Sequence, residues 1–537
     1  MIGFRHTVEI MVDFVQSRMI VQIKILVNLV IADDTLVYGR LYEDLSTFSC
    51  VRLLNSTGVI GCQSFRPVTG ILYPINTSDD IKTFIGQDLN GKFAVVMPYA
   101  LMTIQNLRDL ESSRKLGGII AIINGTSNVS PRPSTFSPDE KCPNCQYGLY
   151  RDETDQYQWN PNGQGLIQER FDFPMFAVYP LDGRALNSYN LIMEGAANNL
   201  RKSFNQYPLR AVELSSFMWS AIDASTCLRR GVDNGISGTI ALLAVADAIS
   251  RSQIAFDNLP KHILYTLFDG EAWGFAGSSR FVADITQFNC QIKGSAKGCP
   301  FKGGCGFPCK QDLDFTRINF TNIESIFEFS QVGMNTKGFY VHVDSNSTVN
   351  VDLINKMNNI SARINNGSAF VQAASANGIN NKLPPSSSMA FLEKNRSLAA
   401  VVLGDFQYNL TNYYNSEYDD AFNVPDDSIV GSICSIANVT AQTVWLQAQG
   451  PNYSNISISY GQPGFIPTLA YNYFLSLNSS LAFCKVPTDC QNGESCYMGR
   501  CTKTLTRYHD AYGAGLQYNQ DGSLLVTDPT KATWVES

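Results

Sequence analysis

The sequence predicts an α/β fold made of a small lobe followed by a larger lobe. A chain of 537 residues can bury a large core and is long enough for two domains. Two aliphatic runs, Phe93–Met97 and Gly118–Ile123, flank a helix-like stretch and indicate a first α/β unit. Farther along, residues 231–285 follow the order helix, strand, helix, with acidic residues directly after the strand. Open α/β sheets carry their sites at the carboxyl ends of strands, so this second unit also indicates where a site lies.

The small lobe is expected over residues 41–207. Residues 1–40 stay unassigned, as a leader or a non-native segment, because the apolar stretch Met19–Ile31 is interrupted by polar side chains and is too short to span a bilayer. No other stretch suggests a membrane-spanning helix at the level of the sequence. The chain as given is therefore expected to be soluble.

Three features define the small lobe. Cys50 and Cys62 lie a short loop apart and predict a hairpin pinned by a disulfide. Leu101–Leu116 predicts the helix between the two aliphatic strands. Tyr157–Leu166 is a loop rich in Gly, Asn and Pro that carries one large aromatic residue, Trp159. From its chemistry alone, this Trp either packs under its own loop or reaches another part of the chain.

The larger lobe is expected over residues 208–537. Gly231–Gly238 contains Asp, Asn, Gly and Ser and predicts a loop that enters a helix, since apolar residues follow with helical spacing. His262–Phe268 is short, aliphatic and aromatic, and predicts a buried strand that ends on Asp-Gly-Glu. A second helix is expected from near Gly277, and another over Ser435–Ala448.

Cysteines and glycosylation sequons indicate a lumenal or extracellular glycoprotein. The 14 cysteines are expected to form disulfides, with a four-cysteine module at 483–502. A zinc site is the alternative for Cys142-x-x-Cys145 and for the loop from Cys290, but both lack a nearby His. The cysteines are Cys50, Cys62, Cys142, Cys145, Cys227, Cys290, Cys299, Cys305, Cys309, Cys434, Cys484, Cys490, Cys496 and Cys501. The expected glycan acceptors are Asn55, Asn76, Asn124, Asn128, Asn319, Asn346, Asn359, Asn366, Asn395, Asn409, Asn438, Asn452, Asn455 and Asn478.

The charge and the motifs exclude several classes of function. Charged residues make up 16% of the chain and the net charge is −7, which does not fit a nucleic-acid-binding or polybasic membrane surface. The sequence has no Gly-x-Ser-x-Gly nucleophile turn and no phosphate-binding P-loop. It has four histidines, and none falls where the motifs below would need a metal-binding imidazole.

Two motifs of the larger lobe resemble those of zinc aminopeptidases. Gly231-Val232-Asp233-Asn234-Gly235-Ile236-Ser237-Gly238 resembles a turn whose Asp bridges two metals, and Asp233 matches that Asp. Asp269-Gly270-Glu271-Ala272-Trp273-Gly274-Phe275-Ala276-Gly277-Ser278 resembles a Gly-Glu-Glu-x-Gly-x-x-Gly-Ser turn that supplies a general base and then a metal ligand. Glu271 matches the base, whereas Ala272 replaces the ligand. A methyl group cannot bind zinc, so the resemblance implies a degenerate metal site.

Stretches spread along the chain are similar to the nicastrin family, metal-free relatives of the aminopeptidases. They include Cys50–Ser64, Phe171–Phe176, Ala224–Arg230, Asn322–Gly333, Leu383–Ser388, Ala400–Phe406, Tyr413–Asp420 and the end of the chain at Ser537. The resemblance implies a small α/β lobe, a large aminopeptidase-like lobe with a mixed central sheet, and a lid role for Trp159. It implies a substrate pocket formed by Asp233, Glu271, Ala272, Trp273, Phe275, Gly277, Ser278 and Glu328.

The chain also departs from these families. Ser330, with Glu328 as the nearest acid, and Asn415 hold places where active enzymes have metal ligands. Arg230 runs straight into Gly231, where both families have a longer segment that includes a strand, so residues are expected to be missing there. Phe275 lacks the Tyr hydroxyl usual in nicastrins. Three acids without imidazole make a poor zinc site, so neither a metal nor another cofactor is expected.

The resemblance implies a non-catalytic ectodomain of γ-secretase that gates or recruits type I membrane protein substrates. The implied partners are presenilin and two smaller membrane subunits, reached through a transmembrane helix absent from this chain. The implied location is the lumenal or extracellular side of the endoplasmic reticulum, Golgi, endosome and plasma membranes. Glu271 either pairs with a substrate ammonium group or is a hydrogen-bonded carboxylate that supports folding. The alternatives are an active zinc aminopeptidase with ligands in the absent segment, and a receptor ectodomain of the same fold.

Overall fold

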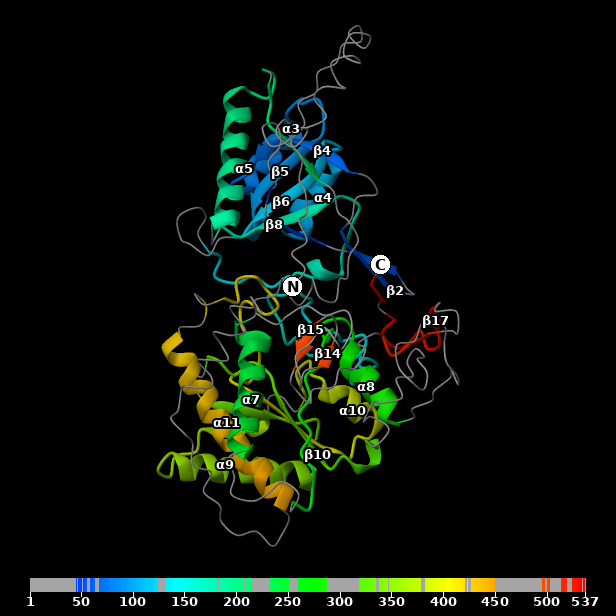
Figure 1. The fold of residues 1–537 in the computed structure, drawn as a ribbon, viewed down its shortest axis with the longest axis vertical. Helices are drawn as coiled ribbons and strands as arrows, with labels where there is room; N and C mark the ends of the chain where they lie inside the picture. Colours follow the sequence, from blue (N-terminus) through cyan, green and yellow to red (C-terminus); the bar gives the residue numbers. More distant parts are fainter. Residues whose placement is uncertain are drawn as a thin grey trace.

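The computed structural model has two lobes, drawn one above the other in Figure 1. The residues that it describes are 45, 47–50, 52–55, 58–62, 67–123, 132–180, 183–206, 208–214, 232–250, 259–286, 318–334, 338–345, 347–377, 382–420, 423, 426–449, 495–497, 500–502, 513–518, 524–533 and 535–536. The predicted α/β class is confirmed, because each lobe is built on a mixed sheet covered by helices.

The small lobe contains a six-stranded sheet with a parallel centre. In spatial order its strands are β1 (Phe48–Ser49), β8 (Met175–Val178), β6 (Leu116–Ile122), β5 (Phe93–Pro98), β4 (Val68–Pro74) and β9 (Ala211–Leu214). The inner four strands are parallel, and the edge strands β1 and β9 are antiparallel to their neighbours. All residues of β6 are buried, as expected for a parallel strand covered on both faces. The two predicted strands are therefore confirmed as β5 and β6.

Three helices cover this sheet: α3 (Ser78–Gly86), α4 (Ile104–Ser112) and α5 (Gly183–Arg201). The predicted helix between the two strands is confirmed as α4, although it is shorter than expected. It begins where the Thr103 side chain accepts a hydrogen bond from the Asn106 amide. The predicted lobe boundary after residue 207 falls before β9, so the small-lobe sheet extends to Leu214.

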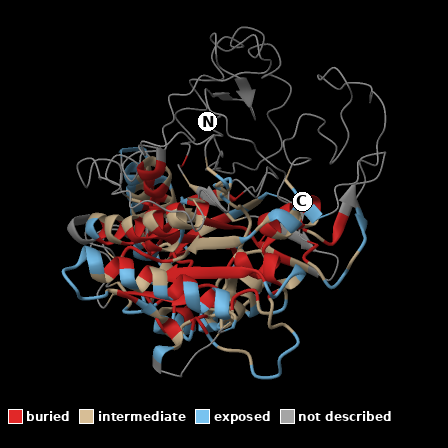
Figure 2. Cartoon of the chain, turned by 90° about the horizontal axis from the view of Figure 1, so that it is seen from below, coloured by how far each residue is buried: buried red, intermediate tan, exposed pale blue. Residues whose placement is uncertain are grey.

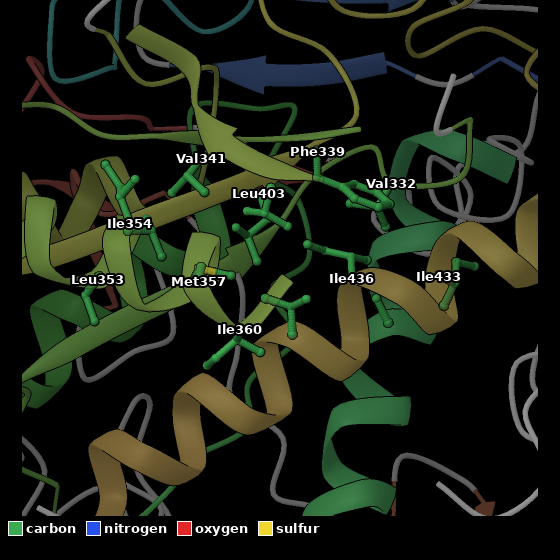
Figure 3. Close-up of a cluster of buried hydrophobic side chains, with 14 of the residues drawn as sticks. Val332, Phe339, Val341, Leu353, Ile354, Met357, Ile360, Leu403, Ile433 and Ile436 are labelled. Carbon is green, nitrogen blue, oxygen red and sulfur yellow. The ribbon is translucent and has the colours of Figure 1, made fainter. Parts of the chain in front are cut away.

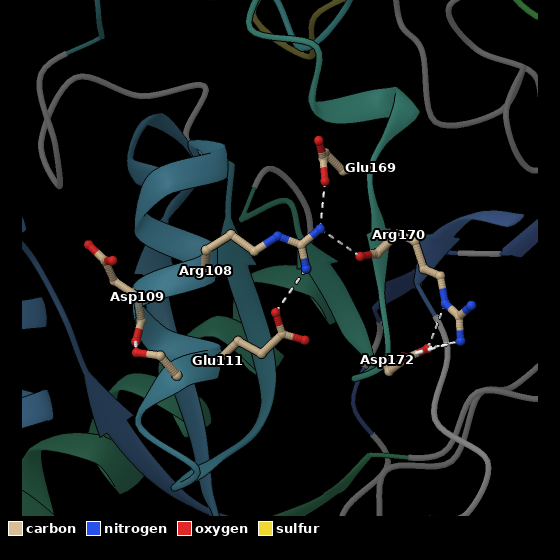
Figure 4. A network of polar contacts seen from close by, with 7 residues as sticks. Arg108, Asp109, Glu111, Glu169, Arg170 and Asp172 are labelled. Atoms are coloured by element: carbon tan, nitrogen blue, oxygen red, sulfur yellow. Dashed lines mark hydrogen bonds and ion pairs between the residues drawn. The ribbon is translucent and has the colours of Figure 1, made fainter. Parts of the chain in front are cut away.

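Arg108 on α4 fastens the helix to the stretch that leads into β8 (Figure 4). Its guanidinium is 2.5 Å from the Glu169 carboxylate, 2.8 Å from that of Glu111, and donates to the Arg170 carbonyl at 3.0 Å. It also lies over the Phe171 ring, 4.7 Å from the centroid. Several weak contacts thus converge on one side chain, which fixes the path of the chain before β8.

A second small sheet joins both ends of the described chain. Its order is β18 (Val535–Glu536), β2 (Arg52–Asn55), β3 (Gly58–Cys62) and β7 (Arg170–Phe171). The predicted hairpin is confirmed as β2–β3, and the Cys50–Cys62 disulfide is present. β18 pairs with β2 in antiparallel fashion, so the carboxyl-terminal strand lies beside the amino-terminal hairpin.

The larger lobe contains a four-stranded mixed sheet in the order β10 (Ser325–Phe329), β13 (Ala399–Gly404), β11 (Phe339–His342) and β12 (Val371–Ala373). Around it lie α7 (Gly238–Ser250), α8 (Ala276–Thr286), α9 (Thr348–Ile364), α10 (Ser388–Lys394) and α11 (Asp426–Gln449). Two short hairpins follow, β14 (Ser495–Tyr497) with β15 (Arg500–Thr502), and β16 (Leu516–Tyr518) with β17 (Leu524–Val526). The helices predicted after Gly238, near Gly277 and over 435–448 are confirmed as α7, α8 and α11.

The core of the larger lobe lies between its sheet and α9 and α11. Figure 3 shows Val341 and Leu403 of the sheet facing Met357 of α9 and Ile436 of α11. Seen from below, the buried residues fill the centre of the described part and the exposed ones lie along its outer edge (Figure 2). This packing sets the positions of the strand ends at which the candidate site lies.

The predicted buried strand over residues 262–268 is wrong. The segment forms no strand and pairs with none among the described residues. Leu264 and Leu267 are 57% and 63% exposed. The aliphatic composition that favoured a buried strand is real, but burial also requires a neighbouring strand with which to pair, and composition does not supply that information.

One described helical stretch, Ile429–Gln449 of α11, is long and apolar enough to cross a membrane, contrary to the expectation from the sequence. Just over half of its most apolar window, 56%, is buried inside the lobe. Its Ile433, Ile436 and Val439 side chains belong to the core described above. The apolar character of this helix is therefore explained by packing in the lobe.

Candidate functional site

A cavity of about 1000 Å³ lies in the larger lobe beside β10. Its lining includes five of the eight predicted pocket residues, which are Glu271, Ala272, Trp273, Phe275 and Glu328. The other three, Asp233, Gly277 and Ser278, are buried next to lining residues. The structure thus brings the two motifs of the larger lobe to one cavity.

Both oxygens of the Glu271 carboxylate accept hydrogen bonds from the protein. Oε1 accepts from the Ser278 amide at 2.9 Å, and Oε2 accepts from the hydroxyls of Ser278 at 2.8 Å and Ser387 at 2.6 Å. Ser278 lies on α8 and Ser387 immediately precedes α10, so one carboxylate ties two helices to the turn. Burial raises the pKa of Glu271 to about 7, although these hydrogen bonds oppose the rise.

Glu328 on β10 is held in a similar way by Ser387 and by Ser388, the residue that follows it. Its Oε1 accepts from the Ser387 amide at 2.8 Å, and its Oε2 accepts from the Ser388 amide at 2.8 Å and hydroxyl at 2.5 Å. Burial raises the pKa of Glu328 above its ordinary value. Ser387 therefore bridges Glu271 and Glu328, with its hydroxyl bound to one and its amide to the other.

The turn that carries Glu271 has a backbone shape that its residue types explain. Gly270 and Gly274 have positive φ angles of 69° and 72°, which favour glycine. At Gly277 a Cβ atom would meet the Asp269 carbonyl oxygen at 2.5 Å, so a larger residue does not fit there. Phe275 is 3% exposed and packs in the core beneath the turn, even though its φ is 55°. The glycine positions thus allow the backbone shape of the turn, and the packing of Phe275 holds the turn in place.

Asp233 is fully buried at the start of the α7 loop. Its Oδ1 accepts from the Gly333 amide at 2.7 Å, while its Oδ2 has no hydrogen-bond partner among the described residues. The Asp233 amide donates to Asp419. Burial raises the pKa values of Asp405 to about 7 and of Asp419 to about 6, and the pKa of Asp233 rises for the same reason and because Asp405 and Asp419 lie nearby. Three acidic groups that share one buried region are thus stabilised in their protonated forms.

The residues at the ligand places do not fit zinc. Ala272 offers no ligand atom, and the Asn415 amide is already bonded on both sides, accepting from Asn234 at 2.5 Å and donating to Asp139 at 2.5 Å. The described residues contain no group of three or more His, Cys, Asp or Glu that could hold a metal ion. The two glutamates are bound to serine donors. Zinc sites are built from His, Cys and carboxylate ligands, whereas two of the ligand places here hold a methyl group and a bonded amide, so this arrangement does not offer a zinc site.

Residues 132–165, which we call the strap, lie between two elements of the small lobe but bind the larger lobe. Asn144 donates from its side chain to the Glu271 carbonyl at 2.6 Å and accepts from the Gly274 amide at 2.9 Å. The Phe136 amide donates to the Asn412 carbonyl at 3.0 Å. The Arg151 guanidinium is 2.6 Å from the Glu393 carboxylate. The strap is thus fastened to the turn of Glu271 and to the loop after β13.

Trp159 of the strap is 3% exposed and packs against Phe406 and Leu410 of the larger lobe. Its carbonyl accepts from the Leu410 amide at 2.8 Å. Its ring lies edge-on to His342, with centroids 5.4 Å apart. The His342 ring bonds the Phe406 carbonyl at 2.9 Å, and burial lowers its pKa to about 4. Trp159 therefore connects the strap to the larger lobe, while its predicted role in a lid stays a prediction.

The predicted disulfides and glycan acceptors are described in part. Cys142–Cys145 is a disulfide within the strap, Cys434 lies on α11, and Cys496 faces Cys501 across the β14–β15 hairpin. The cysteines Cys227, Cys290, Cys299, Cys305, Cys309, Cys484 and Cys490 lie outside the described residues. Among the acceptors, Asn76, Asn319, Asn359, Asn366, Asn395 and Asn409 are exposed and Asn438 is half-buried. Asn124, Asn128, Asn346, Asn452, Asn455 and Asn478 lie outside the described residues, and Asn55 lies on β2.

Sequence reasoning missed Ser387, Ser388, Asn144, Asp405 and Asp419 as members of the site. The first two belong to a serine run just before α10, which is a helix-start signal and is not specific for a site. Asn144 lies inside the Cys142-x-x-Cys145 motif, which drew attention to the cysteines instead. Asp405 and Asp419 lie in stretches that carry the family resemblance, yet nothing local shows that they meet Asp233.

Comparison of the sequence with protein-family models and with curated proteins finds similarity to the nicastrin family. The sequence model described as the nicastrin small lobe matches residues 49–220, and the one described as the nicastrin large lobe matches residues 221–445. Nicastrin of Dictyostelium purpureum is 26% identical over 577 aligned positions, covering 90% of this chain and 84% of that protein. Human nicastrin is 25% identical, covering 82% of this chain and 70% of that protein.

Two details of these comparisons bear on the structure. The crystal structure of the gamma-secretase component nicastrin aligns with a TM-score of 0.67 at 23% identity, covering 92% of this chain and 97% of that one. The fold of the chain is therefore that of nicastrin. In the alignment with the Dictyostelium purpureum protein, 90% of this chain, or about 483 of its 537 residues, is aligned over 577 positions. About 94 positions therefore hold residues of the relative alone.

Proposed function

The chain belongs to the nicastrin family, and from this premise we propose that it is a non-catalytic, glycosylated ectodomain of a γ-secretase complex. In this role it gates or recruits type I membrane protein substrates on the lumenal or extracellular side of the membrane. Its partners are presenilin and two smaller membrane subunits, reached through a membrane-spanning helix. The nicastrin whose crystal structure aligns with this chain is a gamma-secretase component, which supports the assembly.

The observation that carries the non-catalytic role is the chemistry at the ligand places. Ala272 has no ligand atom, and the Asn415 side chain is bonded to Asn234 and Asp139. The carboxylate at the general-base position, Glu271, accepts three hydrogen bonds from Ser278 and Ser387. A general base in a two-metal peptidase acts on a metal-bound water, and Ala272 and Asn415 do not supply the side chains that would bind those metals.

The same contacts favour a supporting role for Glu271 over direct pairing with a substrate. Its two oxygens tie α8 and the start of α10 to the turn, and Asn144 ties that turn to the strap. A substrate ammonium group would have to compete with these serine donors. Gating then comes from the bulk of the folded ectodomain, and the Glu271 carboxylate stabilises the turn to which the strap binds.

The assembly can be tested in cells that lack their own nicastrin. The chain would be expressed with and without an appended carboxyl-terminal membrane-spanning helix, and presenilin recovery and substrate cleavage would be measured. We expect both only with the appended helix, and faster cleavage of a substrate with a short ectodomain than of one with a long ectodomain. Recovery of presenilin without any preference for short ectodomains would contradict the gating role.

The enzyme alternative needs a separate measurement. Purified chain would be assayed for bound metal by mass spectrometry and for hydrolysis of aminoacyl reporter substrates with added zinc. We expect neither bound zinc nor turnover. Near-stoichiometric zinc with turnover that Glu271→Gln abolishes would overturn the non-catalytic role and identify an aminopeptidase.

A further inference from the structure

The strap contains a disulfide that a thiol in solution can reach. Cys142 and Cys145 are bonded to each other across a Cys-Pro-Asn-Cys sequence, and both residues are partly exposed. In the Cys50–Cys62 disulfide, by contrast, Cys62 is 1% exposed and belongs to the core of the small lobe. Thiol–disulfide exchange requires a thiolate to reach a sulfur atom, so exposure favours the strap disulfide as a target.

The sizes of the two disulfide loops favour the same target. The strap disulfide joins residues only 3 positions apart, whereas Cys50 and Cys62 are 12 positions apart. A disulfide restricts the unfolded chain more when it closes a longer loop, so the folded state loses less stability when the shorter loop is opened. The paired strands β2 and β3 also keep the hairpin cysteines close together after any reduction, which favours their re-oxidation.

Between the two strap cysteines lies Asn144, which binds the turn of Glu271. Its side chain is 6% exposed, donates to the Glu271 carbonyl at 2.6 Å and accepts from the Gly274 amide at 2.9 Å. Its φ angle is 56°, in the left-handed region that residues other than glycine seldom adopt. A closed loop restricts the backbone of Asn144, and an open chain would populate this conformation less. The redox state of the cysteine pair is therefore linked to the contact with the turn.

The strap also has an acceptor for a reduced cysteine. Cys142 Sγ lies 3.3 Å from the Tyr157 carbonyl oxygen. A disulfide sulfur has no hydrogen to donate, whereas a thiol is a weak donor, so reduction of Cys142 would allow a hydrogen bond at this distance. The contact between the Trp159 carbonyl and the Leu410 amide does not involve the cysteine loop. The strap can therefore hold the dithiol form and remain attached to the larger lobe.

We propose that Cys142–Cys145 is a thiol–disulfide exchange site, at which a dithiol reductant releases the Asn144 side chain from the turn of Glu271. A thiolate of the reductant attacks one of the two sulfurs; the bond between them breaks, a mixed disulfide forms, and the released cysteine takes up a proton. The second thiol of the reductant then attacks the mixed disulfide. The chain gains two electrons and two protons, and the reductant becomes a cyclic disulfide.

The expected consequence is local. Glu271, Ala272 and Trp273 of the released turn line the cavity beside β10, so reduction loosens one wall of that cavity. Trp159 continues to hold the strap through its contact with Leu410. The site goes beyond the proposed role in γ-secretase and does not depend on it.

The first test compares the two disulfides in the purified chain. The chain is equilibrated with dithiothreitol at graded ratios of its reduced to its oxidised form, free thiols are trapped with N-ethylmaleimide, and each cysteine is followed by mass spectrometry. We expect Cys142 and Cys145 to be half-reduced at a ratio at least about tenfold lower than Cys50 and Cys62. Reduction of the hairpin disulfide first, or of both disulfides together, would overturn the proposal.

Hydrogen exchange tests the link to the turn. At a dithiothreitol ratio that reduces only the strap disulfide, the Gly274 amide should exchange at least about fivefold faster than in the oxidised chain. The Leu410 amide should change by less than about twofold, because its partner is the Trp159 carbonyl. Unchanged exchange at Gly274 would overturn the proposal, and so would equal acceleration at both amides, which would mean that the whole strap detaches.

Two variants provide matched controls. The double substitution Cys142→Ser and Cys145→Ser removes the disulfide but keeps a donor opposite the Tyr157 carbonyl, and should make the Gly274 amide exchange fast with or without dithiothreitol. Asn144→Ala keeps the disulfide and should also give fast exchange at Gly274 in both redox states. Thermal unfolding checks that both variants are folded. Slow exchange at Gly274 in the folded double-serine variant would overturn the proposal.

Discussion

The two sides of the turn that carries Glu271 use their backbone groups differently. On one side the strap supplies a partner for the turn, where Asn144 bonds both the Glu271 carbonyl and the Gly274 amide. On the other side residues 262–268 make no hydrogen bond to a strand of the described chain. The comparison teaches that the described part of the chain is firmly bonded where the strap meets the larger lobe, whereas β10 has no described partner strand along its outer edge.

The largest expected effect comes from removing the Trp159 side chain on the closed side. Trp159→Ala should lower the free energy of unfolding by about 3–5 kcal/mol, because a buried aromatic contact with Phe406 and Leu410 is replaced by a cavity. Denaturant unfolding measures the loss, and hydrogen exchange should show faster exchange in the strap. Trp159→Phe is the control and should retain much of the stability. A strap that stays fully protected in the Ala variant would show that Trp159 does not hold it.

Asn144→Ala tests the polar half of the same interface. It leaves the Glu271 carbonyl and the Gly274 amide without their partner, and should cost about 2 kcal/mol or more. Thermal unfolding gives the size of the effect. Asn162→Ala, which removes only a long contact of 3.4 Å on the same strap, should change stability by less than about 0.5 kcal/mol. Equal losses in the two variants would mean that the clamp on the turn is unimportant.

The dependence of stability on pH should distinguish the buried carboxylates from His342 in the closed interface. Asp405 and Glu271 have folded pKa values near 7, above those of unfolded carboxylates, so the folded state binds more protons between about pH 4 and 7. The contribution of these two carboxyl groups to the free energy of unfolding is greatest at low pH and is lost as pH rises towards 7. His342 in the closed interface has a folded pKa of about 4, so its contribution is instead lost as pH falls from about 6.5 to 4.

The carboxylates outnumber this one histidine, so the melting temperature should be higher at pH 5 than at pH 8, by about 5 °C. Differential scanning calorimetry at a series of pH values measures this difference. Asp405→Asn should flatten the curve, and His342→Gln should steepen it. A melting temperature that rises steadily with pH would contradict the raised pKa values.

The smallest effect is expected on the open side. Leu264→Ser and Leu267→Ser should each change the free energy of unfolding by less than about 0.5 kcal/mol, since both side chains are more than half exposed. Denaturant unfolding provides the value. A loss of 2 kcal/mol or more would show that something covers these residues in solution, and the difference between the two sides would disappear.

The same difference explains which features could be predicted from the sequence. β5 and β6 were predictable because each is a continuous apolar run with neighbours on both sides. Residues 262–268 are also rich in aliphatic and aromatic residues but have no described neighbouring strand, so the prediction of a buried strand was wrong. A local pattern reports the chemistry of a segment, whereas burial depends on segments that are distant in the chain.

The site follows the same logic. Glu271, Asp233 and Glu328 were found because they lie in turns and strands with a recognisable order. Asp405 and Asp419 were missed because they come close to Asp233 only in the folded chain. In the sequence, more than 170 residues separate Asp233 from Asp405. The serine donors were missed because a Ser before a helix is common and does not by itself indicate a carboxylate partner.

The sheet that joins β18 to β2 has a consequence for the order of synthesis. β2 pairs with β3 as soon as the hairpin leaves the ribosome, but β18 lies about 480 residues later in the chain. At roughly 5–20 residues per second, one edge of the hairpin remains without β18 for on the order of 25–100 s. During this interval the Cys50–Cys62 disulfide keeps β2 on β3 while the edge remains open to other chains. A nascent chain stalled before residue 535 would thus expose a hairpin edge that β18 covers in the folded structure.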